Sequence, residues 1–261
     1  MSWLNDKGIR VFLTREGGVF LKREELALDD YEFAKAVKVA LIVGGDGTFL
    51  KAARLLAPYG VLMLGINVGR LGFLVSESVS TLEIALSKVL EGKFEIDERM
   101  MLEASFKGEV FYALNEFVIM KGAFARLINL RVFIDEEYFA SYPADGLIIS
   151  TPTGSTAYSL SAGGPILHPA LPGMVLTPIC AHTFYARPII IPLQSSVRII
   201  VEADHEDIML TQDGQIGFRV LPGDEVFIKK APFFARMITF KGRSFFELLR
   251  KKLKLGVVPG D

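Results

Sequence analysis

Gly44-Gly45-Asp46-Gly47-Thr48 combines three glycines with one carboxylate, directly after the apolar run at residues 39–43. Glycines at the end of a buried strand let backbone N–H groups approach phosphate oxygens, and a following helix adds positive potential. A carboxylate beside phosphates is unfavourable unless it binds a metal or accepts a proton from an attacking hydroxyl. The pentapeptide therefore fits phosphoryl transfer with Asp46 as the catalytic group. It equally fits a plain turn in which Asp46 or Thr48 caps the helix.

Two common phosphate loops are excluded by the residues around this pentapeptide. The chain contains no Gly-x-x-x-x-Gly-Lys-Ser/Thr sequence, and Leu50 stands where a dinucleotide fingerprint would need its third glycine. Any nucleotide site here is of another kind.

A second glycine-rich loop covers residues 65–74 and follows another apolar run. Its Arg70 could pair with a phosphate, and its Phe73 could stack on a base. The alternative is a tight connection with Phe73 in the core.

Residues 145–165 form a strand-like run, then a loop dense in Ser and Thr, then a short helical segment. Hydroxyls and unpaired N–H groups at a helix start suit sugar hydroxyls, phosphates or an amide. Ser155 lacks the Gly-x-Ser-x-Gly context of a nucleophile. The alternative structural role is Thr153 as a helix cap, but one cap does not require so many hydroxyls, so this loop is predicted to bind a ligand.

Asn115-Glu116 interrupts an otherwise apolar strand pattern. Adjacent strand residues point to opposite faces, so one of these polar side chains must face the core or a cleft and needs a partner there.

The elements that would position these residues change in character along the chain. Up to residue 92, strand-like runs at 8–13, 39–43 and 61–66 alternate with helical patterns at 49–56 and after 80. The second helix is predicted to open with capping-box spacing at Ser80 to Glu83 and to close at Gly92. The apolar run 39–43 is expected to be covered on both faces, as in a parallel sheet with crossover helices.

From residue 94 to about residue 240, short β-rich runs are separated by turn signals near residues 107–109, 135–137 and 222–224. This pattern predicts an antiparallel sandwich with one helical interruption at 155–162. The predicted organisation is an α/β domain with a parallel, Rossmann-like sheet at 1–95 and an all-β sandwich at 96–240. The helical segment 241–261 is expected to return to the first domain.

The composition of the chain argues against several classes of protein and of binding site. The formal charge of −1 makes a basic nucleic-acid-wrapping protein improbable on electrostatic grounds. Cys180 is the single cysteine, which rules out an internal disulfide, and with three histidines the chain offers no Cys/His zinc site. The N-terminal residues do not resemble a signal peptide, and no apolar stretch reaches the ~18 residues of a membrane span. We expect a cytoplasmic protein that binds neither nucleic acid nor membrane.

Taken together, these motifs resemble the NAD kinase (ATP–NAD kinase) family. The similarity extends to residues 178–188 and to Asp213-Gly214-Gln215, and it covers most of the chain in the expected order. The pentapeptide is shared with diacylglycerol and sphingosine kinases, whereas Thr151 to Tyr158 with Asn115-Glu116 upstream is more specific to NAD kinases. Ala181 stands where family members often have proline.

The resemblance implies an activity and a set of roles. The reaction moves the γ-phosphoryl group of ATP to the 2′-hydroxyl of the adenosine ribose of NAD, giving NADP, with Mg²⁺ or Mn²⁺. Asp46 would orient and deprotonate that hydroxyl. Asp145 resembles a residue that a neighbouring subunit contributes, which implies a homo-oligomer, either dimer or tetramer. The predicted nucleotide-binding residues are Gly44, Gly45, Gly47, Thr48, Arg70, Phe73, Asn115, Glu116, Asp145, Thr156, Ala157, Tyr158 and Ser161; no protein metal ligand is predicted.

Two alternative functions compete with this prediction. A lipid kinase could use the same pentapeptide, but the hydroxyl-rich loop is a poor lining for an acyl chain. A regulator that binds NADP without making it would gain nothing from a carboxylate beside phosphate.

Overall fold

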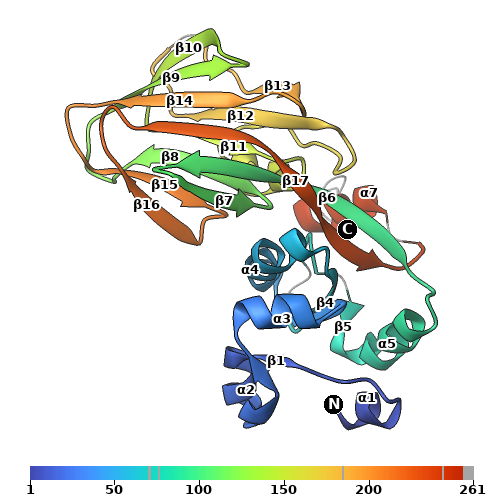
Figure 1. Cartoon of the computed structure of the whole chain (residues 1–261). Helices are drawn as coiled ribbons and strands as arrows, with labels where there is room; N and C mark the ends of the chain where they lie inside the picture. Colours follow the sequence, from blue (N-terminus) through green and yellow to red (C-terminus); the bar gives the residue numbers. More distant parts are fainter. Residues whose placement is uncertain (70–71, 76, 184, 243, 255–261) are drawn as a thin grey trace. The chain divides into compact units, whose positions relative to one another are not determined.

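The computed structural model describes residues 1–69, 72–75, 77–183, 185–242 and 244–254. The chain divides into two compact units, one formed by Met1–Asp97 and Ala235–Arg243, the other by Glu98–Phe234 and Ser244–Asp261. Figure 1 labels the elements of both units along the chain. Two long strands, β6 (Glu95–Phe106) and β17 (Glu225–Thr239), contribute residues to each unit.

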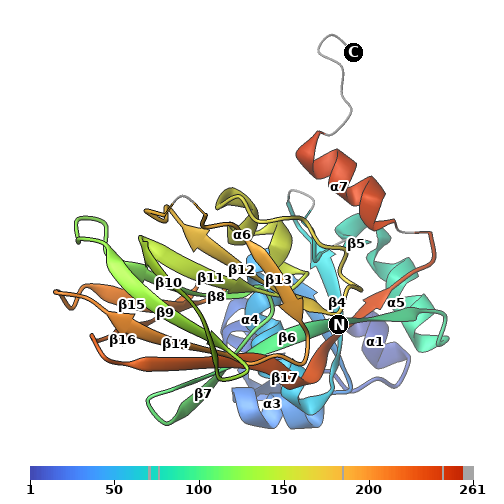
Figure 2. The same ribbon diagram turned by 90° about the horizontal axis from the view of Figure 1, so that it is seen from above.

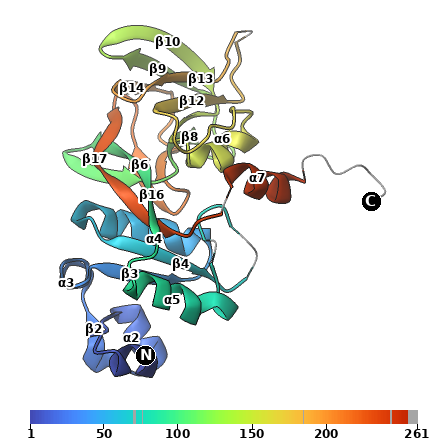
Figure 3. The same ribbon diagram turned by 90° about the vertical axis from the view of Figure 1, so that its right-hand side faces the viewer.

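The first unit contains the parallel sheet that the sequence predicted. Its strands are β3 (Val39–Val43), β4 (Leu62–Asn67) and β5 (Glu77–Ser78), and β4 also pairs in parallel with the end of β17. Helices α4 (Asp46–Leu56) and α5 (Leu82–Leu90) lie on opposite sides of β4 (Figure 3). The apolar stripe of α4 is buried, as its helical spacing predicted.

Strand β3 is not covered on both faces, which corrects the expectation from its apolar run. Ala40 and Ile42 are buried, whereas Val39, Leu41 and Val43 are 38%, 38% and 56% exposed. The exposed residues share a face with Leu62, Leu64 and Ile66 of β4, to which they are paired. On that face the core formed with α5 includes Leu64 and Ile66 but does not reach β3.

Smaller elements of this unit are α1 (Ser2–Asp6), β1 (Leu13–Thr14), α2 (Arg15–Leu21), η1 (Glu24–Leu26), β2 (Ala27–Leu28), α3 (Asp30–Ala36), η2 (Ala57–Tyr59) and η3 (Val79–Thr81). Two local predictions were wrong. Residues 8–12 are not a strand, and only β1 forms next to them. The capping box joins Ser78 and Thr81, two residues earlier than predicted, because a short 3-10 turn precedes α5.

The second unit is the predicted antiparallel sandwich, and Figure 3 shows its two layers. One layer orders β10 (Glu137–Ala144), β9 (Ile128–Ile134), β14 (Val197–Glu202) and β17, and β6 pairs with β17 and with β7 (Glu109–Ala113). The other layer orders β13 (Ile189–Pro192), β12 (Gly173–Ile179), β11 (Gly146–Ser150), β8 (Glu116–Lys121), β15 (Ile208–Gln212) and β16 (Ile216–Val220). Side chains from both layers form one apolar core.

The predicted turns join consecutive strands of this unit. Lys107 and Gly108 between β6 and β7, and Asp135 and Glu136 between β9 and β10, all have positive φ. That backbone conformation matches the twist of hairpin strands. Gly223, between β16 and β17, also has positive φ.

The helical interruption consists of η4 (Gly154–Thr156) and α6 (Tyr158–Ser161), which lies against β11 (Figure 2). The final helix α7 (Phe245–Leu253) packs the rings of Phe245 and Phe246 against His168, with centroids 5.0 Å and 5.6 Å apart. Residues Ala235–Arg243 belong to the first unit, whereas the helix that follows them is grouped with the second; the return of 241–261 to the first domain stays a prediction. Within the described residues, no helix is both long and apolar enough to cross a membrane.

Candidate active site

Asp46 begins α4 at the carboxyl end of β3, and its side chain is held by backbone donors from the second glycine-rich loop. Oδ2 accepts from the N–H of Phe73 at 2.7 Å, while Oδ1 accepts from Leu74 at 3.0 Å and Val75 at 3.2 Å. Three N–H donors around one carboxylate fix its position within this unit. The side chain of Asp46 therefore joins the two predicted loops and does not cap its own helix.

Close packing explains some of the glycines around Asp46 and not others. A Cβ on Gly44 would lie 2.4 Å from Oγ1 of Thr48, and one on Gly72 would lie 1.9 Å from Oδ1 of Asp46. A side chain at either position would therefore force Thr48 or the Asp46 carboxylate to move. Among the described residues, no atom beyond the chain neighbours of Gly45 lies within 4 Å of the place where its Cβ would be, so packing against them does not explain this glycine. Space beside the N-terminus of α4 is what an approaching phosphate requires.

The second loop is only partly described. Arg70, the predicted phosphate partner, lies outside the described residues. Phe73 is half-buried, and Leu74 and Val75 are buried. The loop therefore anchors its apolar side chains while its N–H groups hold Asp46.

In the second unit, residues 114–116 form a corner of the backbone where β8 begins. This corner is held by hydrogen bonds on two sides. On one side, the Thr151 N–H donates to the Asn115 carbonyl at 2.8 Å, and Thr151 Oγ1 donates to the Leu114 carbonyl at 2.6 Å. On the other side, the Asp213 carboxylate accepts from the N–H of Leu114 at 3.3 Å, Asn115 at 2.8 Å and Glu116 at 3.4 Å. The backbone at this corner is consequently fixed by groups from two separate turns.

Of the two polar residues in this strand pattern, Glu116 is the one whose side chain lies in the interior. It is 4% exposed, and among the described residues its Oε2 has no hydrogen-bond partner. Burial and, to a smaller extent, the negative charge of Asp213 together raise the pKa of this carboxyl to about 8, although the Tyr158 backbone N–H opposes the rise. At neutral pH the carboxyl therefore carries a proton and can donate a hydrogen bond.

Most hydroxyls of the 151–161 loop serve the loop itself. Ser155 Oγ donates to the Pro152 carbonyl at 2.6 Å and accepts from the Leu167 N–H at 2.9 Å, and Ser159 Oγ contacts Thr177 Oγ1 at 2.9 Å. Thr153 makes no capping bond with its side chain and instead accepts from Arg99 at 3.3 Å. The density of hydroxyls is thus largely explained by folding of the loop.

The predicted binding residues of this loop are the accessible ones. Tyr158 is 39% exposed, Ser161 is exposed, and Thr156 and Ala157 are half-buried. Thr156 ends η4, Ala157 links η4 to α6, and Tyr158 and Ser161 lie on α6. The Tyr158 N–H bonds to the Glu116 carboxyl, so the second unit brings at least this part of the loop to the Asn115-Glu116 corner.

Asp145 lies away from that group along the same pair of strands. Glu116 is paired with Ser150 at one end of β11, whereas Asp145 precedes Gly146 at the other end and forms an ion pair with Lys121 at 3.4 Å. Five residues of extended strand separate these ends by roughly 17 Å. Within one chain, Asp145 and Glu116 thus lie at opposite ends of β11 and are too far apart to contact the same group.

Sequence reasoning missed the roles of Thr151 and Asp213. Both were part of recognised motifs, but only their contacts show that they hold the Asn115-Glu116 corner. The signal for Asp213 is an Asp-Gly turn between two strands, a pattern that predicts a hairpin and not what its side chain binds.

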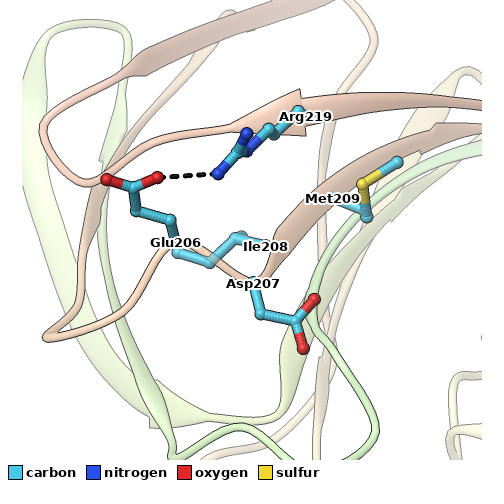
Figure 4. Close-up of a pocket in the computed structure, with 5 residues that line it drawn as sticks. All are labelled: Glu206, Asp207, Ile208, Met209 and Arg219. Carbon is cyan, nitrogen blue, oxygen red and sulfur yellow. Dashed lines mark hydrogen bonds and ion pairs between the residues drawn. The ribbon is translucent and has the colours of Figure 1, made fainter.

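A separate hollow of about 350 Å³ is lined by Glu206, Asp207, Ile208, Met209 and Arg219 (Figure 4). The exposed side chains of Glu206 and Arg219 form an ion pair across it at 2.7 Å. None of the predicted site residues lines this hollow.

Both parts of the chain match known protein families. Residues 3–94 match the family model of the ATP-NAD kinase N-terminal domain, and residues 114–240 match that of the ATP-NAD kinase C-terminal domain. The chain is 45% identical over 260 residues to an NAD kinase of Moorella thermoacetica, covering 98% of this chain and 83% of that relative. It is 47% identical over 228 residues to an NAD kinase of Carboxydothermus hydrogenoformans, covering 85% and 81%.

Solved structures show the same architecture. Yeast NADH kinase complexed with NADH has a TM-score of 0.89 at 26% identity, covering 98% of this chain and 82% of that one. An NAD kinase from Archaeoglobus fulgidus in complex with ATP has a TM-score of 0.73 at 28% identity, covering 92% and 94%.

Proposed function

Because this chain belongs to the NAD kinase family, we propose that it transfers the γ-phosphoryl group of ATP to the 2′-hydroxyl of the adenosine ribose of NAD, producing NADP. The observation that carries the proposal is the Gly-Gly-Asp-Gly-Thr loop, with its carboxylate fixed beside an open helix N-terminus, in a chain that matches the family in both domains. The relatives give no support to a lipid kinase or to a regulator without activity.

Asp46 is the group we propose to act on the 2′-hydroxyl. A carboxylate has about four acceptor positions on its two oxygens. Among the described residues, Oδ1 accepts from two N–H groups and Oδ2 from one, so Oδ2 keeps a position for the hydroxyl proton. Fixed in this way, Asp46 can orient the hydroxyl for in-line attack and accept its proton as the new P–O bond forms.

The N-terminal end of α4, with Gly45 at its N-cap, would stabilise the transferred phosphoryl group, because backbone donors and the helix dipole favour negative charge there. The Gly44 N–H is donated to the Ile66 carbonyl at 2.9 Å, so Gly44 would shape the loop and not contact the phosphate through its N–H. Mg²⁺ or Mn²⁺ is proposed to arrive bound to ATP and to neutralise charge on the β- and γ-phosphates.

The residues grouped in the second unit would hold the adenosine end of NAD. Asn115 and the protonated Glu116 offer hydrogen-bond donors, and Tyr158 offers a ring face beside them. Asp145 lies at the far end of β11, so we propose that it completes the pocket of a neighbouring subunit in a homo-oligomer.

The test is formation of NADP from NAD, ATP and Mg²⁺, measured with an NADP-specific dehydrogenase. Parallel reactions replace NAD with diacylglycerol or sphingosine. Turnover with NAD alone supports the proposal. Phosphorylation of a lipid, or tight dinucleotide binding with no turnover under any phosphoryl donor, would overturn it.

A further inference from the structure

Asp213 sits in the turn between β15 and β16, where its backbone adopts an unusual conformation. Its φ is +50°, that of Gly214 is +62°, and the Gln215 N–H donates to the Gln212 carbonyl at 2.9 Å. Positive φ at both central residues is typical of a type I′ turn, in which Asp is among the few side-chain-bearing residues tolerated. The turn directs the Asp213 side chain inward, since the residue is only 5% exposed.

The inward carboxylate bonds to the backbone of the corner. It accepts from three successive N–H groups, of Leu114, Asn115 and Glu116, at 2.8–3.4 Å. In return, the Asp213 N–H donates to the Glu116 carbonyl at 3.0 Å. Asp213 therefore accepts three hydrogen bonds from residues 114–116 and donates one to them.

The opposite side of the corner leaves no space for it to shift. A Cβ on Gly154 would lie 2.2 Å from the Asn115 carbonyl oxygen, and Thr151 bonds to both Leu114 and Asn115. The corner is therefore fixed between the 151–154 turn and Asp213.

We infer that Asp213 is a positioning residue of the reaction: its carboxylate fixes the backbone of residues 114–116 and thereby aims the side chains of Asn115 and Glu116 at the dinucleotide. This inference rests on the proposed function for the identity of the ligand. Asp213 itself acts through the corner.

The same carboxylate has an electrostatic effect on Glu116. Among the described residues, the groups that act on Glu116 include Asp213 from the β15–β16 turn and the Tyr158 N–H from α6, and the neutral Ser150 is paired with it on β11. Burial is the larger cause of the raised pKa of Glu116, and the charge of Asp213 adds to it. Asp213 thus helps to keep a proton on Glu116, whose buried Oε2 has no partner in the described chain and can donate to an acceptor atom of the ligand.

The experiment compares Asp213→Asn and Asp213→Ala with the wild type. Asparagine tolerates the positive φ and keeps one acceptor oxygen but carries no charge, whereas alanine loses both oxygens. Asp224→Asn is the matched control, because the Asp224 carboxylate also caps a turn, accepting from the Leu221 N–H at 2.8 Å, but does not contact the corner.

We expect Asp213→Ala to raise KM for NAD by about tenfold or more, the loss of roughly one strong hydrogen-bonded contact, with KM for ATP unchanged. Asp213→Asn should recover part of that loss while shifting the pH dependence of kcat/KM for NAD to lower pH. Asp224→Asn should change neither quantity. Folded Asp213 variants with wild-type KM for NAD and an unshifted pH profile would overturn the inference.

A second measurement does not depend on turnover. ¹³C NMR of labelled glutamate side chains, with Glu116→Gln to assign the signal, should show Glu116 losing its proton at lower pH in Asp213→Asn than in the wild type. An unchanged titration would refute the electrostatic part of the inference. If the wild type makes no NADP, the proposed function fails, while this titration still decides whether Asp213 acts on Glu116.

Discussion

Replacing Asp46 with asparagine separates the chemical role of its carboxylate from its structural role. In the structure, the carboxylate accepts three backbone hydrogen bonds, two at Oδ1 and one at Oδ2. Asparagine keeps one acceptor oxygen and replaces the other with an N–H₂ donor. If the oxygen stays opposite Leu74 and Val75, the amide faces the Phe73 N–H, and that bond is lost.

The structural part of the loss can be estimated. A hydrogen bond to a charged group contributes about 1.5–3 kcal/mol, and the two remaining bonds weaken because their acceptor becomes neutral. We therefore expect the free energy of unfolding to fall by about 2–3 kcal/mol. The chemical part is the loss of a general base, which lowers kcat by at least ~10²-fold, equivalent to about 2.7 kcal/mol in the activation barrier.

The assay measures kcat for NADP formation alongside urea unfolding of the same preparations. Asp29→Asn is the matched control, because Asp29 also accepts a backbone N–H, from Glu32 at 2.9 Å, but caps α3 and lies outside the loop. Asparagine caps helices as well as aspartate does, so this variant should keep both stability and rate. Gly72→Ala complements the pair, because its Cβ would displace the Asp46 carboxylate without removing it, and kcat should again fall.

The refuting result is a folded Asp46→Asn protein with near-normal kcat. It would mean that the three N–H bonds are the whole function of this carboxylate. A loss of stability with no loss of rate would lead to the same conclusion.

Three further predictions concern the second unit. Gly154→Ala should raise KM for NAD at least several-fold, measured by initial rates, because its Cβ would meet the Asn115 carbonyl; an unchanged KM would argue against the rigid corner. Glu116 binds its proton more tightly when folded, with a pKa of about 8 against 4.5, so the unfolded state releases the proton first as pH rises. The free energy of unfolding should then fall between about pH 4.5 and 8, by up to about 5 kcal/mol, in urea titrations, and Glu116→Gln should abolish that slope. Asp145→Ala should weaken NAD binding, and mixing it with the Asp46→Asn protein should restore activity in hybrid oligomers; no restoration would count against a shared site.

The sequence predicted the fold where local patterns match the final packing. The turns predicted at residues 107–109 and 135–137 and the helical stripe of α4 are confirmed. Strand β3 shows the limit of such patterns. Its five apolar residues suggest burial on both faces, but burial depends on how far α5 extends across the sheet, and a local window contains no information on that distance.

The sequence identified the residues of the candidate site by their type, but it did not predict which groups they bond to. The sequence left Asp46 as either a catalytic carboxylate or a helix cap, and the partners that hold it lie 27–29 residues away. Asp213 bonds to residues 97–99 positions earlier in the chain. Contacts at such separations arise from strand pairing across the sheet, which a motif does not encode.

The hydroxyl-rich loop shows a second limit of reasoning from residue type. Its Ser and Thr residues suggested a ligand, but Ser155 and Ser159 are buried and bonded within the unit. Composition alone does not separate a hydroxyl that closes a loop from one that faces solvent. The prediction that this loop binds a ligand now depends on the accessible residues Thr156, Tyr158 and Ser161.

The most direct test of the account follows the phosphoryl group itself. The wild-type protein is incubated with NAD, Mg²⁺ and ATP labelled in the γ-phosphate, and the dinucleotide product is isolated and its labelled position determined. The account predicts one labelled phosphoryl group per product molecule, attached to the 2′-oxygen of the adenosine ribose. Label at another position, or release of labelled phosphate with NAD unchanged, would contradict it.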